Sequence, residues 1–234
     1  LKVAGPREWE REALTFPKGR EKPPFQTLDQ IERRIKRGKL SEPEQAILWE
    51  SLWLDTAQTL DVLETVRNAD VEPVIYPMFV TAAYTGARRG ELLRSEKDDW
   101  DFEGGQVAIR QSKSDTSKTF TIRHVPIHQA LERVMREWFR QHDSHLAFIR
   151  DDGEPVNERL ASRFFHKALK GSKWGMLHGW HVFRHSLASN LASKGVDQRQ
   201  IDSILGHSTE AMSRRYRHLL PANQASAIAN IFPE

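Results

Sequence analysis

The sequence predicts an α+β protein that is mainly helical, with a small antiparallel β-sheet built as a hairpin near residues 100–127. Apolar residues recur at three- and four-residue spacing through most of the chain, as on one face of an amphipathic helix. Around residues 100–127 that spacing gives way to short apolar runs punctuated by Gly104 and Gly105. With 234 residues, 38% of them hydrophobic and 29% charged, the chain is long enough to bury a sizeable core.

Composition excludes several kinds of site. The chain has no cysteine, so neither a disulfide framework nor a thiolate metal site is available. The sequence has no membrane-length apolar run and no signal-peptide pattern, which predicts a cytoplasmic protein without a membrane partner. Asp151 and Asp152 are adjacent but lack a third ligand at a sensible spacing, so a metal-dependent nuclease is poorly supported. No phosphate-binding or zinc-protease motif occurs, and we expect neither a cofactor nor a metal.

The N-terminal part is expected to contain a linker and then the start of the folded domain. Residues 1–24 combine several Pro and Gly with mixed charges, as a linker or arm does, and the domain is expected to cover 25–234. The first residue is Leu, which suggests a fragment of a longer protein. Thr27 can cap a helix that continues to Lys36, and residues 41–68 show a longer helical pattern that is broken once.

A strongly apolar helix is predicted over Val71–Tyr84, and it leads into the sequence TGARRGELL. Gly86 permits a tight turn, and Glu91 lies in the first turn of the next helix. Arg88 has two interpretations. It can be a surface partner of Glu91, or, placed after a glycine turn at the end of a buried helix, it can be held ready to bind a phosphate.

The hairpin near residues 100–127 is expected to pair residues 106–110 with 120–127 around a polar tip, SKSDTSK. The tip carries Lys113 and Lys118. Lysines at a loop tip are usually just solvated. Beside a basic cleft, however, such a lysine can enter a DNA groove and give a proton to a leaving alkoxide.

Two helices follow the hairpin. Residues 128–142 have an amphipathic pattern, and 157–170 form a second helix after a short apolar segment at 146–149. The second helix has a basic face that suits a phosphate backbone, formed by Arg159, Arg163, Lys167 and Lys170.

The stretch from His178 to His218 contains most of the chemically useful side chains. Helical spacing predicts one helix that stops near Gly195, a second that ends at Gly206, and a third. The first helix bears two of the groups three residues apart, hence on one face, and the whole set comprises His181, Arg184, His207 and Tyr216. A phenol, guanidinium groups and imidazoles suit an attack on a phosphodiester.

Charge is distributed unevenly along the chain. The formal net charge is only +3, but residues 159–217 hold eleven Lys and Arg against Asp197, Asp202 and Glu210, an excess of eight positive charges. A segment of this kind favours binding of a nucleic-acid backbone. The alternative is a solvated basic face without a partner. The tail, residues 219–234, has apolar residues that can pack on its own domain or on a second copy.

Four segments in this order resemble the catalytic domain of the tyrosine recombinases, the phage integrase family. They are TGARRGELL, HVFRH, LGH and a tyrosine nine residues after the LGH histidine. The resemblance covers about residues 25–220 and implies that family's mainly helical fold. It also implies specific roles: phosphate clamping by Arg88 and Arg184, a hydrogen bond to a nonbridging oxygen from His207, proton removal by His181, nucleophilic attack by Tyr216, and protonation of the departing 5′-oxygen by Lys113.

The resemblance implies a site-specific recombinase or integrase, typical of mobile elements, that cleaves and rejoins DNA through a 3′-phosphotyrosyl intermediate. Double-stranded DNA is then the expected partner, with a homo-tetramer on DNA and a monomer or weak oligomer without it. Lys118 is the alternative to Lys113 and is otherwise expected to contact DNA with Arg159, Arg163 and Lys167. Type IB topoisomerase chemistry and a non-catalytic DNA-binding relative are the two alternative functions.

Overall fold

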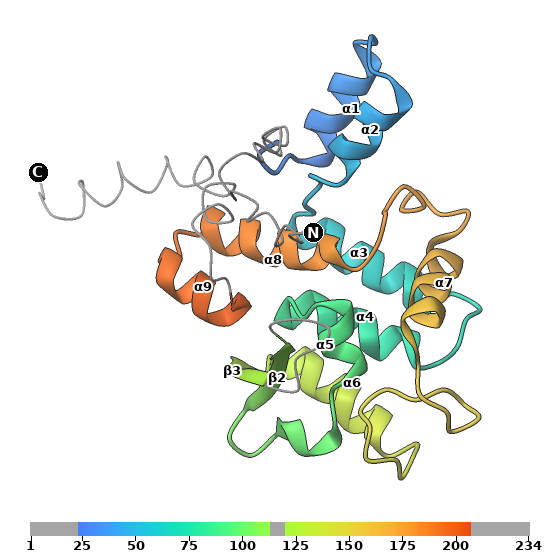
Figure 1. The fold of residues 1–234 in the computed structure, drawn as a ribbon, viewed down its shortest axis with the longest axis vertical. Helices are drawn as coiled ribbons and strands as arrows, with labels where there is room; N and C mark the ends of the chain where they lie inside the picture. The colour runs from blue at the N-terminus through green and yellow to red at the C-terminus, as the bar shows by residue number, and fades with distance from the viewer. Residues whose placement is uncertain (1–22, 113–119, 207–234) are drawn as a thin grey trace, which may run out of the picture.

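The computed structural model describes residues 23–112 and 120–206. This part of the chain is mainly helical and has one small antiparallel sheet, as predicted (Figure 1). Within it, none of the helices combines the length and apolar character that crossing a membrane requires. The elements are α1 (Leu28–Lys36), α2 (Glu42–Trp49), α3 (Thr56–Arg67), α4 (Ile75–Thr85), α5 (Arg89–Leu93), the 3-10 turn η2 (Lys97–Asp99), β1 (Trp100–Asp101), β2 (Gln106–Ser112), β3 (Phe120–Pro126), α6 (Gln129–Phe139), α7 (Glu158–Leu169), α8 (His181–Ser193) and α9 (Gln198–Leu205).

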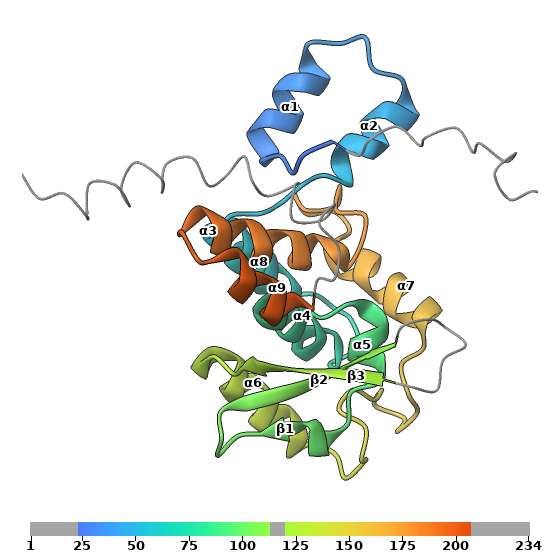
Figure 2. The same cartoon turned by 60° about the vertical axis from the view of Figure 1, so that its left-hand side comes forward.

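The first two helices form a hairpin that projects from the rest of the molecule (Figures 1 and 2). Thr27 caps α1 as predicted, because its side chain accepts a hydrogen bond from the backbone of Gln30. The predicted break in residues 41–68 is confirmed, since α2 ends at Trp49 and Asp55 caps the start of α3. Backbone hydrogen bonds from Gln26 to the chain after α2 close the base of the hairpin.

The apolar helix predicted before Gly86 is α4, and it forms the centre of the core. Nine of its eleven residues are buried, so it has no polar face. Its Phe79 ring stacks on Phe165 of α7 at 4.9 Å and meets the edges of Trp180 and Phe183 at 4.7 and 5.3 Å. These contacts fix α7 and the start of α8 against α4, which is the base on which the candidate site is built.

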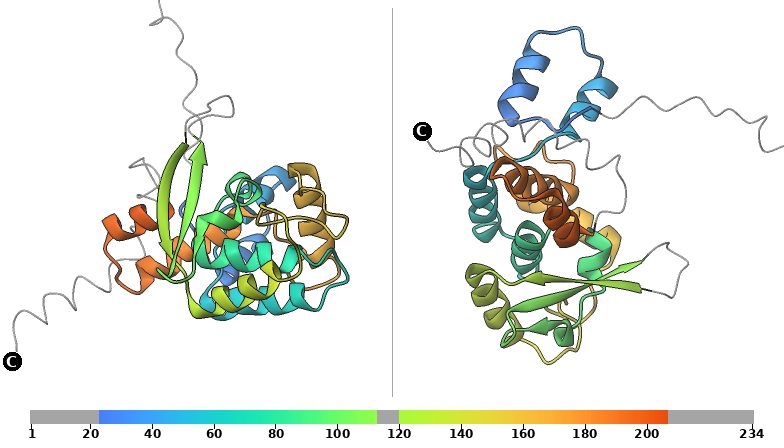
Figure 3. Two further views of the ribbon diagram at one scale, coloured as in Figure 1. Left: turned by 90° about the horizontal axis from the view of Figure 1, so that it is seen from below. Right: turned by 90° about the vertical axis from the view of Figure 1, so that its left-hand side faces the viewer.

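The three strands pair in the order β1-β2-β3, and the predicted hairpin is confirmed. The sheet and the α1–α2 hairpin lie at opposite ends of the molecule (Figure 3). Val107 pairs with Val125 and Ile109 with Arg123 on the buried face, whereas Ile122 on the other face is 58% exposed. The tip of the hairpin, including Lys113 and Lys118, lies outside the described residues.

Two glycines end helices in the left-handed conformation, at the positions where the sequence predicts turns. Gly86 (φ 63°) closes α4 and Gly206 (φ 65°) closes α9. The two helix ends also lie in contact. A Cβ atom on Gly86 would overlap the Leu205 side chain and lie 3.3 Å from Leu187, so the close approach of α8 and α9 to this turn requires glycine.

Candidate functional site

Arg88 lies immediately before α5, two residues after the Gly86 turn. Its backbone N–H donates to Glu91 Oε2 at 2.9 Å, and its Nη1 donates to Glu91 Oε1 at 2.7 Å. The predicted contact with Glu91 therefore exists, but it does not bury the arginine, because 39% of the Arg88 side chain remains exposed. Since a guanidinium has five N–H donors, Arg88 can keep this contact and still bind an oxyanion.

Glu91 is a buried carboxylate shared by two arginines. Besides Arg88, its Oε2 accepts a hydrogen bond from Nη2 of Arg123 at 2.8 Å. Burial raises the pKa of the Glu91 carboxyl, but the hydrogen bond and charge of Arg123, together with those of Arg88, outweigh burial and hold the pKa below its ordinary value. Glu91 is therefore ionised at neutral pH and restrains Arg88 through both backbone and side chain.

Arg184 reaches the same turn from α8. The residue is 2% exposed, and its Nη1 donates to the carbonyl oxygen of Gly86 at 3.1 Å. α8 is held in place by Ser186 and Asn190, which hydrogen-bond to the backbone of Leu54. Two arginines that are far apart in the sequence are thus brought to the two sides of one glycine turn.

His181 begins α8, on the same side of the helix as Arg184 and beside Arg88. Although part of the residue is exposed, the pKa of its imidazole is lowered, first by burial of the ring in the site and then by the positive charges of Arg88, Arg184 and Arg89. Glu91 opposes this shift. At neutral pH the ring is therefore neutral, which is the form that can accept a proton.

An open cleft of about 950 Å³ lies between the α1–α2 hairpin and the body of the protein, with Arg88 and His181 on its wall. Trp53 is buried in the core, whereas Trp49, at the end of α2, is only partly buried and lines this cleft. The polar wall of the cleft also includes Arg89, Glu91, His166 and His178. Cationic and imidazole groups on one wall suit a phosphate group, and two guanidiniums can stabilise its charge without a metal.

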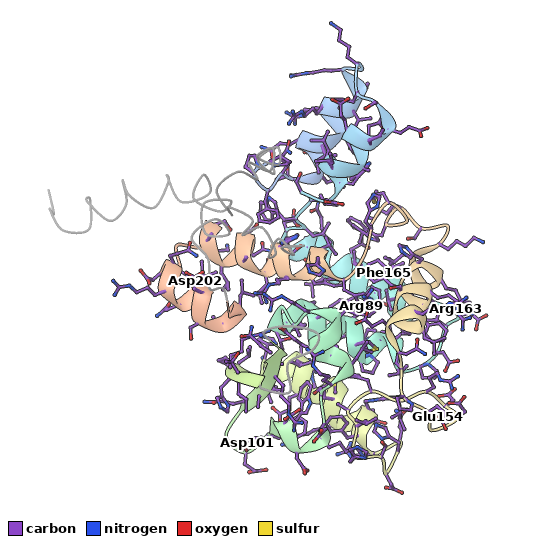
Figure 4. The ribbon with its side chains drawn as sticks, in the orientation of Figure 1. Arg89, Asp101, Glu154, Arg163, Phe165 and Asp202 are labelled. Atoms are coloured by element: carbon purple, nitrogen blue, oxygen red, sulfur yellow. The ribbon has the colours of Figure 1, made fainter. Side chains whose placement is uncertain are left out.

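Arg89 ties α5 to α7, a contact that the sequence did not reveal. Its Nη2 pairs with Glu158 at 2.5 Å and its Nη1 donates to Ser162 at 2.8 Å. In Figure 4 Arg89 and Phe165 lie on the inner side of α7, whereas Arg163 lies on the outer side. Helical spacing alone could not identify this contact, because Glu158 and Ser162 come from a distant segment.

The basic face predicted on α7 is present but does not line the cleft. Arg159, Arg163 and Lys167 are all exposed, and the guanidinium of Arg163 lies 5.2 Å from the ring of Phe164. The residues of α7 that do line the cleft are Glu158, Ser162, Phe165 and His166. The three polar ones form a stripe about 100° around the helix from the basic one. Contact of the basic face with DNA therefore stays a prediction. If it occurs, it involves the surface of α7 next to the cleft and not the cleft itself.

The structure brings together three of the six side chains predicted to be catalytic: Arg88, His181 and Arg184. The other three, Lys113, His207 and Tyr216, lie outside the described residues, as does Lys118. Sequence reasoning missed Glu91 as a buried member of the site and missed Arg123 altogether. The alternation of side chains in residues 120–127 was the available signal for Arg123, since it places this residue on the same face as Val125.

The lowered pKa of His181 has a measurable consequence for the pH dependence of stability. The unfolded protein binds this proton more tightly than the folded one, so His181 adds stability at pH values above about 6.5 and reduces it as the pH falls below that value. In an NMR titration of the ring proton signals, we expect a His181 midpoint below 6.5, moving upward in Arg88→Gln. A midpoint at or above 6.5 in the unsubstituted protein would contradict the proximity of the arginine charges.

Comparison with known proteins gives concordant matches. A family model described as the phage integrase family matches residues 53–223. The tyrosine recombinase XerA of Thermococcus kodakarensis is 27% identical over 196 residues, which cover 82% of this chain and 64% of the relative. The chain thus spans less than two thirds of that relative's length.

Solved structures show the same fold. A crystal structure of XerA recombinase superposes with a TM-score of 0.61 at 20% identity, covering 89% of this chain and 84% of the other. The Tn1549 transposon integrase, solved in complex with circular intermediate DNA, gives a TM-score of 0.58 at 20% identity and covers 80% of this chain and 70% of the other.

Proposed function

Because the chain belongs to the phage integrase family, we propose that it is the catalytic domain of a tyrosine-type site-specific recombinase, which breaks and rejoins DNA strands. The observation that carries the proposal is the convergence of Arg88 and Arg184 on the two sides of the Gly86 turn, with the neutral imidazole of His181 beside them. Paired guanidiniums next to a neutral imidazole favour attack on a phosphodiester.

The proposed reaction needs no cofactor. The phenol oxygen of Tyr216 attacks phosphorus while its proton passes to His181, and the bond from phosphorus to the 5′-oxygen breaks. Lys113 gives the proton that makes the 5′-hydroxyl, with Lys118 as the alternative donor. Arg88, Arg184 and His207 hold the nonbridging oxygens as their charge grows in the transition state. Attack by a second 5′-hydroxyl then restores a phosphodiester and frees the tyrosine.

Double-stranded DNA is the proposed partner. One solved structural neighbour, the Tn1549 transposon integrase, was solved in complex with circular intermediate DNA. Residues 159–217 of this chain carry an excess of eight positive charges, which suits a phosphate backbone. A homo-tetramer on DNA is part of the proposal, since exchanging strands between two duplexes requires four cleavages.

A covalent adduct on a nicked duplex tests the proposal. DNA flanking the element that encodes the protein is made with a nick just past the cleavage point, so that the freed fragment leaves and the protein stays attached. We expect a labelled protein–DNA band that survives denaturation, and a recombinant product from intact duplexes. DNA binding without an adduct would identify a non-catalytic relative. Relaxation of any supercoiled plasmid, with no recombinant, would identify a topoisomerase.

A further inference from the structure

Arg123 joins three elements at the edge of the candidate site. The residue is 7% exposed on the buried face of β3. Its Nη2 pairs with Glu91 of α5 at 2.8 Å, and its Nε donates to the carbonyl oxygen of Ile204 in α9 at 2.9 Å. One buried guanidinium therefore fixes the strand, the short helix that begins next to Arg88, and the helix that ends at Gly206.

The second arginine beside Glu91, Arg123, leaves the cluster of Arg88, Glu91 and Arg123 with a net positive charge. Glu91 is 4% exposed and accepts from both Arg88 and Arg123, so the three side chains together carry one net positive charge. Without Arg123, the buried carboxylate and Arg88 would form a neutral pair. A buried carboxylate that has lost one partner draws more strongly on the other, and it would compete with a phosphate for the Arg88 guanidinium.

The contact of Arg123 with Ile204 holds the C-terminal end of α9 in place. Carbonyl groups in the last turn of a helix lack partners within the helix, and an arginine can satisfy one of them. The next residue, Leu205, packs against Gly86, whose own carbonyl accepts from Arg184. Gln111 of β2 adds a second, longer contact, because its amide nitrogen lies 3.4 Å from the carbonyl oxygen of Gly206. Arg123 thus supports both sides of the Gly86 turn.

We propose that Arg123 is a positioning residue for the candidate site: it neutralises Glu91 so that Arg88 stays directed at the phosphate, and it holds the end of α9 against the Gly86 turn. The catalytic part of this inference rests on the proposed recombinase function. The part that concerns Arg88 and His181 does not, because it can be measured without DNA.

A set of variants of the full chain separates positioning from a merely structural role. Arg123→Gln leaves Glu91 and Arg88 as a neutral pair, whereas the double variant Glu91→Gln with Arg123→Gln restores one net positive charge. We expect Arg123→Gln to raise the NMR titration midpoint of His181, because Arg88 moves toward Glu91, and the double variant to bring the midpoint back down. Arg123→Lys keeps the charge and should stay close to the unsubstituted protein.

DNA cleavage gives the second readout. In single-turnover reactions at saturating nicked duplex, Arg123→Gln is expected to lower the cleavage rate constant roughly tenfold to hundredfold, with DNA affinity little changed, and the double variant to recover most of that loss. Arg110→Gln is the matched control, since Arg110 also joins the sheet to acidic residues, Glu96 and Asp99, away from the cleft. It should leave both readouts unchanged.

The possible results distinguish the two proposals. The proposed role of Arg123 would be overturned if the double variant had the same His181 midpoint and the same cleavage rate constant as Arg123→Gln. It would also be overturned if Arg110→Gln changed these two quantities as much as Arg123→Gln does. If Arg123→Gln does not fold, the comparison of Arg123→Lys with the double variant decides, because both keep the net charge and both should retain the low His181 midpoint. Failure of the unsubstituted protein to cleave DNA would contradict the proposed function alone, and the His181 titrations would still test Arg123.

Discussion

Replacing Tyr216 by phenylalanine is expected to abolish the covalent protein–DNA product and to leave DNA binding unchanged. Phenylalanine keeps the ring but lacks the oxygen that would bond to phosphorus, so no ester can form at this position. The measurement is the labelled band on the nicked duplex after denaturation, alongside a gel-shift titration of the same duplex.

The chain supplies its own control for this substitution, because it has three tyrosines, Tyr76, Tyr84 and Tyr216. Tyr84 lies on α4, stacked on His128 at 5.0 Å, and burial raises the pKa of its phenol, aided by Tyr76. A phenol with a raised pKa gives up its proton less readily and is a poor nucleophile. Tyr84→Phe should therefore form normal amounts of adduct. Persistence of the adduct in Tyr216→Phe would refute the assignment of the nucleophile.

Replacing Arg88 by glutamine is expected to slow single-turnover cleavage by roughly 10²–10³-fold, the range found when one donor to a transition-state oxyanion is removed. Glutamine can still hydrogen-bond to Glu91 but carries no charge and no fork of donors. DNA affinity should change much less, because the other cations that we expect to contact the backbone remain in place. Rate constants and dissociation constants measured on the same nicked duplex separate the two effects.

Arg136→Gln is the matched control for Arg88. Arg136 pairs with a glutamate on its own helix, Glu132, at 2.7 Å, and it lies on α6. Its replacement removes the same charge and a similar ion pair, so it should leave the cleavage rate constant within about threefold of the original. Equal losses in the two variants would show that Arg88 acts only through overall charge.

The fold was largely predictable because local signals and the resemblance agree. Thr27 and Asp55 cap helices, Gly86 and Gly206 end them, and the spacing of apolar residues fixes the helices between these points. The expected fold, mainly helical with a small antiparallel sheet, is confirmed by the described residues and by the solved relatives. These signals depend on residues close together in sequence, and a single sequence displays them directly.

The parts that could not be predicted depend on contacts between distant segments. In the stretch TIRHVPI, alternation places Arg123 on the same face as Val125, but the hydrophobicity of the single residues favours an inward Ile122 instead. In the structure Arg123 is buried and Ile122 is exposed, because α5 provides the buried carboxylate of Glu91 as an ion-pair partner for Arg123. The basic stripe of α7 is a similar case. Periodicity shows which residues share a face of the helix, but not whether that face borders the cleft.

The bend at Gly86 also limits how this protein can be redesigned. The carbonyl oxygen of Gly86 accepts a hydrogen bond from Arg184, one of the two proposed phosphate-clamp residues, and the other, Arg88, follows two positions later. A side chain at position 86 would collide with Leu205 and crowd Leu187. Random libraries that seek new target sequences should therefore keep residues 86, 187 and 205 fixed as one unit. Diversity belongs on exposed surfaces, such as the outer side of α7, which we expect to contact DNA and which lies apart from the proposed reaction centre.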